Sequence, residues 1–392
     1  MKDFVGVIRL LHTGDWHVGR TLARRSRIDE ARQALDRVVA AAVEHEVDAV
    51  LVCGDVFEHL APSPEAEQVV YEALTRFEGH DIRVVLLAGN HDHPQRWRAI
   101  EPLLGRFAVH AVPEVRRPDR GGIVEVAARD GSTVAQIAAL PWVTERRLVG
   151  AAELMGLPEQ PFQTYATEMA RLIQALCAAF DPSKCNVLAA HFYVSGAKPA
   201  GSERLLTIGD LFAVAPQAIP STPQYVALGH VHRPQRVPGV RVPAHYAGSL
   251  LQLDFGEVGQ GKSLVVVELE PGRPAQVEEL PFVAGRRLVD VRGTIDELEQ
   301  YRDLVDDAYL RVFLDCDRPQ AGIGDQVREL LPNALEVRLE YERDESDAGH
   351  VDLKALTPRE LFERYYRDRH AIDADKELLD LFDRLLDEVT TP

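Results

Sequence analysis

The stretch Val50-Leu51-Val52-Cys53-Gly54-Asp55 is an apolar run that ends at a glycine and then presents a carboxylate. An apolar run of this length, bounded by such a signal, is typical of a strand that is buried on both faces of a parallel sheet. Open α/β sheets build their sites at the carboxyl ends of their strands. The pattern therefore predicts that Asp55 lies at the exit of a buried strand, where a functional site can form.

Four other apolar runs, on both sides of this one in the chain, also end in polar side chains. Three of them repeat the glycine and end in Gly14-Asp15-Trp16-His17, Gly89-Asn90-His91 and Gly229-His230-Val231-His232. The fourth, over residues 187–191, ends in a histidine without a glycine. The side chains expected at the five strand ends are Asp15, His17, Asp55, Asn90, His191, His230 and His232.

These side chains comprise carboxylates, an amide and imidazoles, a mixture that suits Mn²⁺, Fe²⁺ or Zn²⁺ and is too rich in nitrogen for Mg²⁺ or Ca²⁺ alone. Two ions that lie ~3.5–4 Å apart need a shared ligand. A carboxylate can bridge two ions, whereas a neutral imidazole cannot, so we interpret Asp55 as the bridging ligand. A single Gly-Asp pair after a strand is usually structural. The occurrence of all five motifs in one chain predicts a site for two metal ions.

The composition is that of a folded protein with more than one core, because 392 residues exceed the size of an ordinary single domain. The formal charge of −18 opposes nonspecific attraction to phosphate backbones. Binding to nucleic acid would therefore depend on local basic patches or on metal ions. The widely spaced Cys53, Cys177, Cys185 and Cys316 are interpreted as reduced cysteines. With no run of 18 apolar residues and no signal peptide, we expect a cytoplasmic protein that does not span a membrane.

Four arginines, Arg20, Arg24, Arg25 and Arg27, follow the first strand end, and the first acidic residue after His17 is Asp29. Two interpretations of this segment remain open. It could be a solvated loop, or it could contact phosphate groups beside the site, because the guanidinium group suits bidentate phosphate contacts.

The spacing of apolar residues predicts crossover helices over residues 29–43 and 64–77, and hence parallel strands joined by right-handed βαβ connections. Residues 109–140 contain short apolar runs separated by Pro, Gly and Asp, and they are expected to form antiparallel strands. A further helix is expected over residues 162–180. The glycine-containing segment 196–209 is expected to be a loop beside the site.

A new pattern begins after the three prolines between residues 271 and 281, so a domain boundary is expected near residue 285. The order β-α-β-α-β is predicted over residues 288–339, and the charged segment 343–352 is interpreted as a linker. Helices are expected over residues 358–368 and 376–388. They carry more apolar residues than such an isolated pair can bury: Leu361, Phe362, Tyr365, Tyr366, Leu378, Leu379, Leu381, Phe382, Leu385 and Leu386.

The five strand-end motifs, in this order, resemble the calcineurin-like metallophosphoesterase superfamily. Within it, the chain is similar over nearly its whole length to the SbcD family of bacterial nuclease subunits. This narrower similarity lies in residues 226–233, Tyr246-Ala247-Gly248-Ser249, Leu253-Asp254-Phe255-Gly256-Glu257, and Leu361-Phe362 with Tyr365. The resemblance implies an α/β fold, a four-layer calcineurin-like metallophosphoesterase sandwich. Its expected parts are a nuclease domain (1–284), a small β-α-β-α-β capping domain (285–342), a linker (343–352) and C-terminal helices (353–392).

The resemblance also implies roles for individual residues. One metal ion would be bound by Asp15, His17, Asp55 and His232, and the other by Asp55, Asn90, His191 and His230, with Mn²⁺ as the favoured ion. His91, which is adjacent to a ligand, would be the general acid. Some relatives have a histidine three residues after the bridging aspartate. Here that position is Glu58, followed by His59, and neither is given a role.

The function implied by the resemblance is hydrolysis of phosphodiester bonds in DNA repair and recombination. The chain would be an exonuclease on double-stranded DNA and an endonuclease on single strands and hairpins. Its C-terminal helices would dock an SbcC-like coiled-coil ATPase that makes the activity ATP-dependent, and two copies would pair in a heterotetramer. Arg20, Arg24, Arg25 and Arg27 are candidate substrate contacts.

Two other functions are compatible with parts of the sequence. A stand-alone phosphodiesterase or phosphatase for small substrates would share the same metal-binding motifs, but it would have little need of a capping domain or an apolar tail. A non-catalytic scaffold would have no need of the complete set of candidate ligands with His91. The sequence therefore favours the nuclease over both.

Overall fold

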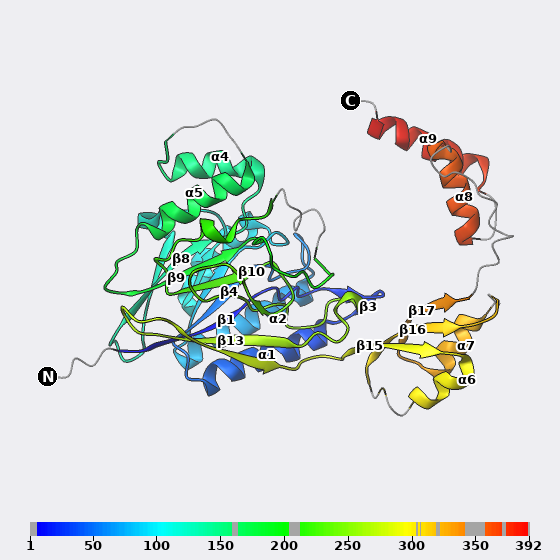
Figure 1. Ribbon diagram of the computed structural model, residues 1–392, viewed down its shortest axis with the longest axis horizontal. Coiled ribbons are helices and arrows are strands. Elements are labelled where there is room, and N and C mark those ends of the chain that lie inside the picture. The colour runs from blue at the N-terminus through cyan, green and yellow to red at the C-terminus, as the bar shows by residue number, and fades with distance from the viewer. Residues whose placement is uncertain are drawn as a thin grey trace. The chain divides into compact units, whose positions relative to one another are not determined.

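The structure is a computed structural model that describes residues 6–158, 164–203, 212–302, 305, 307–318, 322–341, 357–370 and 374–390. Two six-stranded sheets form its centre, and helices cover the outer face of each (Figure 1). Helices α1 and α2 lie on one side of this sandwich, and α4 and α5 lie on the other. The predicted four-layer α/β sandwich is confirmed.

The first sheet has the strand order β14-β13-β1-β4-β5-β6. Its strands β1, β4, β5 and β6 are parallel, and β13 and β14 add an antiparallel edge. The predicted strand at Val50 is β4, which lies between β1 and β5. The bounds are β1 (Ile8–Thr13), β4 (Ala49–Cys53), β5 (Arg83–Leu87), β6 (Val109–Val112), β13 (Lys262–Leu269) and β14 (Gln276–Phe282).

The second sheet has the strand order β11-β12-β10-β9-β8-β7. Strands β12, β10, β9 and β8 are parallel, whereas β11 and β7 are antiparallel to their neighbours. The bounds are β7 (Ile123–Ala127), β8 (Val134–Leu140), β9 (Cys185–His191), β10 (Tyr225–Gly229), β11 (Gln235–Arg236) and β12 (Ala244–Tyr246).

The space between the two sheets is filled by alternate residues of their central strands. Leu51 and Val85 from the first sheet and Val187 and Ala227 from the second belong to one buried apolar cluster. Their neighbours along each strand face outward and pack against the helices, because successive side chains of a strand point to opposite faces. Strands that are buried on both faces explain why the runs that predicted them are apolar throughout.

The helices on the first sheet are α1 (Ile28–Glu44), α2 (Pro64–Arg76) and α3 (Pro94–Leu104). Ser63 caps α2 by accepting a hydrogen bond from the N–H of Ala66, and Pro64 suits the first turn because it needs no donor there. The helices on the second sheet are α4 (Glu145–Leu154) and α5 (Tyr165–Cys177). The three helices predicted over these parts of the chain are confirmed as α1, α2 and α5.

The smaller sheet follows the sandwich in the chain and has the order β15-β16-β17. Its elements alternate in the predicted β-α-β-α-β order: β15 (Leu288–Gly293), α6 (Ile295–Leu298), β16 (Tyr309–Asp315), α7 (Ile323–Leu330) and β17 (Ala334–Glu340). Tyr309 donates to Glu30 of α1, and the Leu288 N–H donates to the side chain of Gln252. By its contacts the chain forms two compact units, Met1–Leu314 with Gly322–Arg338, and Asp315–Ala321 with Leu339–Pro392.

The last two helices are α8 (Pro358–His370) and α9 (Lys376–Thr390), as predicted. They pack on each other through stacked Phe362 and Phe382 rings, whose centroids are 4.3 Å apart. Leu361, Tyr365 and Leu381 remain 38%, 53% and 43% exposed. The predicted linker over residues 343–352 lies outside the described residues, as do residues 204–209 of the predicted loop.

One expectation about strand direction is wrong. Residues 109–140 were expected to be antiparallel, but β6 is parallel to β5 and β8 is parallel to β9, so only the β7–β8 pair fits. The short runs and turn signals reveal strands, but the helices that make β6 and β8 parallel to the strands before and after them, α3 and α4 with α5, lie outside this segment. The proline-containing segment before the boundary predicted near residue 285 contains a strand, β14. In the ranges that the structure describes, no helix is both long and apolar enough to cross a bilayer.

Candidate metal centre

The five strand ends meet at one place, although they belong to two different sheets. Strands β1, β4 and β5 of the first sheet carry Asp15 with His17, Asp55, and Asn90 with His91. Strands β9 and β10 of the second sheet carry His191, and His230 with His232. All seven predicted side chains come together where the carboxyl ends of the two sheets meet.

Glycines before the polar residues lie where neighbouring strand ends leave no room for a Cβ atom. A Cβ atom on Gly229 would lie 1.7 Å from the carbonyl oxygen of Cys53, on the facing sheet. A Cβ atom on Gly89 would lie 2.1 Å from Oδ1 of Asp55. The repeated strand-glycine pattern in the sequence therefore reflects the lack of space for a side chain between the two strand ends.

The backbone turns sharply at the residues that carry the polar groups. Asp15, His17, Asp55 and His230 have φ values of 49°, 47°, 50° and 103°. Residues other than glycine rarely adopt positive φ, and such conformations cost energy that the surrounding structure must supply. Outliers of this kind gather at functional sites. At these four positions the fold holds the side chains of one site in place, and the positive φ angles cost conformational free energy.

Of the three groups of described side chains that could hold a cation, two overlap at Asp55, and the third is His17, Glu58 and His91. In the first overlapping group, one ligand atom from each of Asp15, His17, Asp55 and His232 lies within 4.8 Å of the others, and in the second the same holds for Asp55, His191 and His230. The Asp55 carboxylate is central, because its Oδ2 lies 3.6 Å from Nε2 of His17 and 3.5 Å from Nε2 of His191.

The Asn90 side chain lies in the second group. Its Oδ1 is 3.0 Å from Nε2 of His191 and 2.8 Å from Nδ1 of His230. The members of both groups are buried, except for Asn90, which is partly exposed.

The hydrogen bonds of two histidines show that this cluster fits a cation. Nδ1 of His17 donates to Glu58 at 2.9 Å, and Nδ1 of His191 donates to the Cys53 carbonyl at 2.7 Å. In the neutral rings the Nε2 atoms then carry lone pairs. Yet Nε2 of His17 lies 3.1 Å from Nε2 of His232, and Nε2 of His191 faces the Asn90 oxygen. Acceptors that face one another need a proton or a metal ion between them.

The electrostatics of the cluster agree with this conclusion. Burial alone would raise the pKa of Asp55, but His191, His91 and His17 hold it well below its ordinary value. Burial alone would lower the pKa of His191, but Asp55 raises it to about 9. Burial also raises the pKa of Asp15 to about 6. In the protein without metal, a proton on His191 therefore balances the negative charge of Asp55, which a metal ion could balance instead.

His91 lies beside this cluster and is also buried. Its backbone N–H donates to Oδ1 of Asp55, and its Nδ1 donates to the carbonyl oxygen of Glu58 at 2.7 Å. These two bonds fix the position of the His91 ring and occupy its Nδ1. Burial lowers the pKa of His91. Its ring stands edge-on to that of His17, with centroids 4.7 Å apart.

Two acidic residues that were given no role contribute to the site indirectly. Glu58 accepts from His17 and from Arg20, and these partners lower its pKa to about 2 against the effect of burial. Asp92 accepts from the N–H groups of Phe57 and Gly89 and so joins the loops that carry Asp55 and Asn90. The sequence signal for both was their position in the two strand-end loops. The other unassigned residue, His59, is exposed.

Two segments of the chain match models of known protein families. Residues 8–234, more than half of the chain, match the calcineurin-like phosphoesterase family. Residues 284–370 match the family described as the type 5 capsule protein repressor C-terminal domain.

Curated relatives carry the name of the SbcD subunit of the SbcCD nuclease. The protein of Bacillus subtilis (strain 168) is 28% identical over 385 residues, which cover 96% of this chain and 97% of the relative. That of Rhodobacter capsulatus is 32% identical over 383 residues, covering 91% and 93%. That of Escherichia coli (strain K12) is 28% identical over 305 residues, covering 76% and 75%. The chain belongs to the SbcD family of calcineurin-like phosphoesterases.

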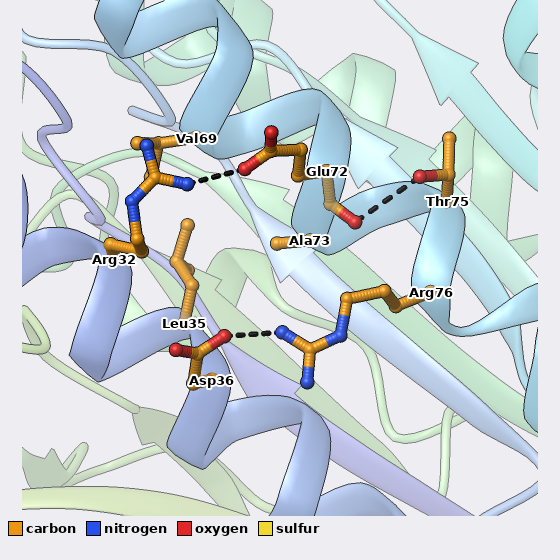
Figure 2. Close-up of a pocket in the computed structure, with 8 residues that line it drawn as sticks. All are labelled: Arg32, Leu35, Asp36, Val69, Glu72, Ala73, Thr75 and Arg76. Atoms are coloured by element: carbon orange, nitrogen blue, oxygen red, sulfur yellow. Dashed lines mark hydrogen bonds and ion pairs between the residues drawn. The ribbon is translucent and has the colours of Figure 1, made fainter.

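Membership of the SbcD family and the buried cluster together establish a site for divalent metal ions. The chemistry of the donors agrees, because imidazole nitrogens with carboxylate and amide oxygens are ligands of first-row divalent metals. A groove of about 310 Å³ between α1 and α2 is a different feature, separate from the metal centre (Figure 2). Its charged side chains pair with each other, Arg32 with Glu72 and Arg76 with Asp36, so they offer little to a ligand.

The four arginines expected near the site differ in their surroundings. Arg24 and Arg25 are exposed in the hairpin formed by β2 (Thr21–Leu22) and β3 (Arg25–Ser26). Arg20 pairs with Glu58 at 2.8 Å. Arg27 is 3% exposed and pairs with Glu30 at 2.7 Å. In this SbcD-family chain the buried Arg27 is not available to a substrate, which corrects the expectation that all four arginines could contact it.

Proposed function

We propose that the chain is the metal-dependent nuclease subunit of an SbcCD-type complex and that it hydrolyses phosphodiester bonds at double-stranded DNA ends and in hairpins. The observation that carries the proposal is the pair of overlapping ligand groups that share Asp55. Two divalent ions, with Mn²⁺ as the native metal, would be held by these groups. Asp15, His17, Asp55 and His232 would bind one ion, and Asp55, Asn90, His191 and His230 the other.

The reaction needs a nucleophile, charge neutralisation on the phosphate and a proton for the leaving alkoxide. Bound divalent ions lower the pKa of a coordinated water and stabilise the charge of the phosphoryl oxygens. The proton for the leaving alkoxide would come from the protein itself. His91 is held by Asp55 and Glu58 on its backbone N–H and its Nδ1, so its Nε2 is the atom that would donate the proton to the departing oxygen.

Contacts to the DNA backbone would come from exposed basic residues, because the net charge of the chain is −18. Arg24 and Arg25 are the candidates that the hairpin turn leaves exposed. Arg20 could contribute once a phosphate competes with Glu58 for its guanidinium group. The smaller sheet, which contacts α1 through Tyr309 and Glu30, would cap the DNA beside the site.

The partner would be an SbcC-like coiled-coil ATPase, and two copies of each subunit would form the complex. The relatives' name, which places them in an SbcCD nuclease, supports this assignment, as do the exposed apolar side chains Leu361, Tyr365 and Leu381 on α8 and α9. Leu361 and Tyr365 lie one turn apart on α8, and apolar side chains that gather in an exposed patch are typical of binding surfaces. The compartment would be the cytoplasm, in agreement with four cysteines that are all unpaired.

The proposal is tested with the purified chain in Mn²⁺, with and without its ATPase partner. The substrates are a DNA hairpin, a blunt duplex and a small phosphodiester such as bis-p-nitrophenyl phosphate. We expect cleavage of all three that EDTA abolishes, with ATP-stimulated digestion of the duplex in the presence of the partner. Cleavage of the small diester alone, unaffected by the partner, would instead indicate a stand-alone phosphodiesterase. Metal binding without cleavage of any substrate would indicate a scaffold.

A further inference from the structure

A buried chain of hydrogen bonds leads from His232 into the core behind the metal centre. Nδ1 of His232 lies 2.6 Å from Oγ of Ser202, and the same hydroxyl donates to Oε1 of Glu257. The other oxygen of Glu257 accepts from Nζ of Lys262 at 2.6 Å. Glu257 is 0% and Lys262 8% exposed. The interior of the fold therefore contains a charged pair that is connected to a candidate metal ligand by one hydroxyl.

The direction of each hydrogen bond follows from what each group can donate. Nζ of Lys262 has only donors, and the N–H of Leu253 also donates to Oε2 of Glu257, at 3.1 Å. Glu257 thus accepts on both oxygens as a carboxylate. The single proton of the Ser202 hydroxyl goes to Glu257, so Oγ can only accept from His232. It follows that Nδ1 of His232 carries the ring proton and that its Nε2 carries the lone pair.

A direct pair between His232 and Glu257 does not account for this arrangement. Nδ1 of His232 lies 3.6 Å from Oε1 of Glu257, which is too long for a hydrogen bond. Ser202 lies between them at hydrogen-bonding distance from both. The hydroxyl is therefore the link through which the carboxylate acts on the ring.

We propose that Glu257, acting through Ser202, is a positioning residue that selects the tautomer in which His232 can bind metal. This inference rests on the proposed function, in which Nε2 of His232 is a metal ligand. Nε2 faces the centre, 3.1 Å from Nε2 of His17. If the proton were on Nε2 instead, His232 could not coordinate an ion. Metal-ligating histidines commonly use their second nitrogen in this way, and loss of the partner group typically costs 10–100-fold in metal affinity or activity.

For His17 and His191, a partner group that can only accept fixes the tautomer directly. His17 donates to Glu58 directly, and His191 donates to a backbone carbonyl, which no substitution can remove. His232 is different, because its hydroxyl partner can either donate or accept. A serine alone would not determine the tautomer, and the direction of its hydrogen bond is set by Glu257. This difference makes the role of Glu257 testable separately from the others.

The first experiment tests the hydroxyl of Ser202. Ser202→Ala removes the hydroxyl but retains the Glu257–Lys262 pair. We expect one of two Mn²⁺ ions, measured by titration calorimetry and by elemental analysis, to bind about 10–100-fold more weakly while the other is unaffected. Ser202→Thr keeps a hydroxyl and should restore affinity. The matched control is Ser249→Ala, because the Ser249 hydroxyl contacts Lys262 and the backbone carbonyl of His232 but not the ring of His232.

The second experiment reverses the direction of the hydrogen bond. In Glu257→Gln the amide nitrogen can donate to Ser202, whose proton would then be directed to Nδ1 of His232. We expect the ring proton to move from Nδ1 to Nε2, which long-range ¹H–¹⁵N spectra of the metal-free protein detect, and one Mn²⁺ to be lost. Urea unfolding and circular dichroism verify that each variant is folded.

The outcomes separate this inference from the proposed function. If the wild-type chain binds no Mn²⁺, or if His232→Ala leaves both ions in place, the proposed function fails. If the wild type binds two ions and Ser202→Ala binds them equally tightly, the role of the hydroxyl fails. A folded Glu257→Gln that keeps its proton on Nδ1 and both ions would show that Glu257 only stabilises the core.

Discussion

The backbone N–H of His91 donates to Oδ1 of Asp55 at 2.8 Å. This bond joins the proposed proton donor to the proposed bridging carboxylate, and it leaves Oδ2 of Asp55 facing His17 and His191. The two residues come from neighbouring strands, β4 and β5, so their separation is set by the sheet itself. Each has a different expected role, and substitution of each should therefore have a different effect.

Asp55→Asn should abolish cleavage and lower the metal content, because a neutral amide cannot balance the charge of two divalent ions at once. Elemental analysis and hydrolysis of a small phosphodiester in Mn²⁺ are the measurements. The control is Asp36→Asn, at a carboxylate that is half-exposed on α1 and pairs with Arg76. Two tightly held ions and normal turnover in Asp55→Asn would contradict the bridging assignment.

His91→Ala should lose turnover and keep both metal ions, since His91 is expected to donate a proton and not to bind metal. General acid catalysis is typically worth about 10²–10⁴-fold in rate. The comparison is with His93→Ala, two residues further on and exposed. Loss of one ion from His91→Ala would assign His91 to the metal ligands instead.

The exposed and the buried arginines should respond in opposite ways. The double substitution Arg24→Ala and Arg25→Ala should weaken binding to duplex DNA. The slope of log K against log[salt] should become shallower by up to about two, because up to two phosphate contacts are lost. The free energy of unfolding should not change. Arg27→Ala should reduce stability, because it leaves the carboxylate of Glu30 without its buried partner.

The measurements for the arginines are DNA binding at several salt concentrations and urea unfolding. Arg117→Ala with Arg120→Ala is the control pair, at exposed positions elsewhere on the surface. Equal losses of DNA affinity for the control pair and for the hairpin pair would remove the hairpin from the DNA-binding surface.

Leu361→Glu with Tyr365→Glu should abolish association with the coiled-coil ATPase and the ATP-stimulated digestion of duplex ends. Metal binding and cleavage of small diesters should be unchanged, because no proposed ligand lies beyond His232. Val149→Glu, at a side chain that is 51% exposed on α4, is the control. Full-affinity binding of the ATPase by the double variant, measured by calorimetry, would refute docking through these helices.

His12 should make the stability of the metal-free protein depend on pH. It is fully buried between the sheets and bonds to Tyr225 and to the Leu228 carbonyl, and burial lowers its pKa to about 3. The unfolded chain takes up the proton near pH 6.5. The folded protein is therefore fully stabilised above pH 6.5 and loses about 1.4 kcal/mol for each pH unit below it, down to the folded pKa.

In His12→Gln the amide can replace both hydrogen bonds without titrating, so the variant should lose about 1.4 kcal/mol less than the wild type between pH 7.5 and 5.5. Urea unfolding in EDTA at the two pH values is the measurement. The exposed His59→Gln should behave like the wild type. Identical pH dependence of His12→Gln and the wild type would show that His12 does not contribute.

The strands and the polar residues at their ends were predictable from the sequence, because both signals are local. A strand buried on both faces reads as an unbroken apolar run, as at Val50 to Cys53, and the glycine after it marks a place without room for a side chain. The same locality made α1, α2 and α5 predictable from the spacing of their apolar residues. Residues at the exits of parallel strands could therefore be named as one site from the sequence.

Only the tertiary structure decided that these exits belong to two sheets, and which groups stand behind them. The antiparallel prediction for residues 109–140 failed because helical crossovers outside this segment make β6 parallel to β5 and β8 parallel to β9. Glu257 reaches His232 through Ser202, and Arg27 is buried against Glu30, and neither contact leaves a periodic signal. Hydrogen bonds between distant segments depend on packing in three dimensions, whereas strand ends and glycines depend on the local chain.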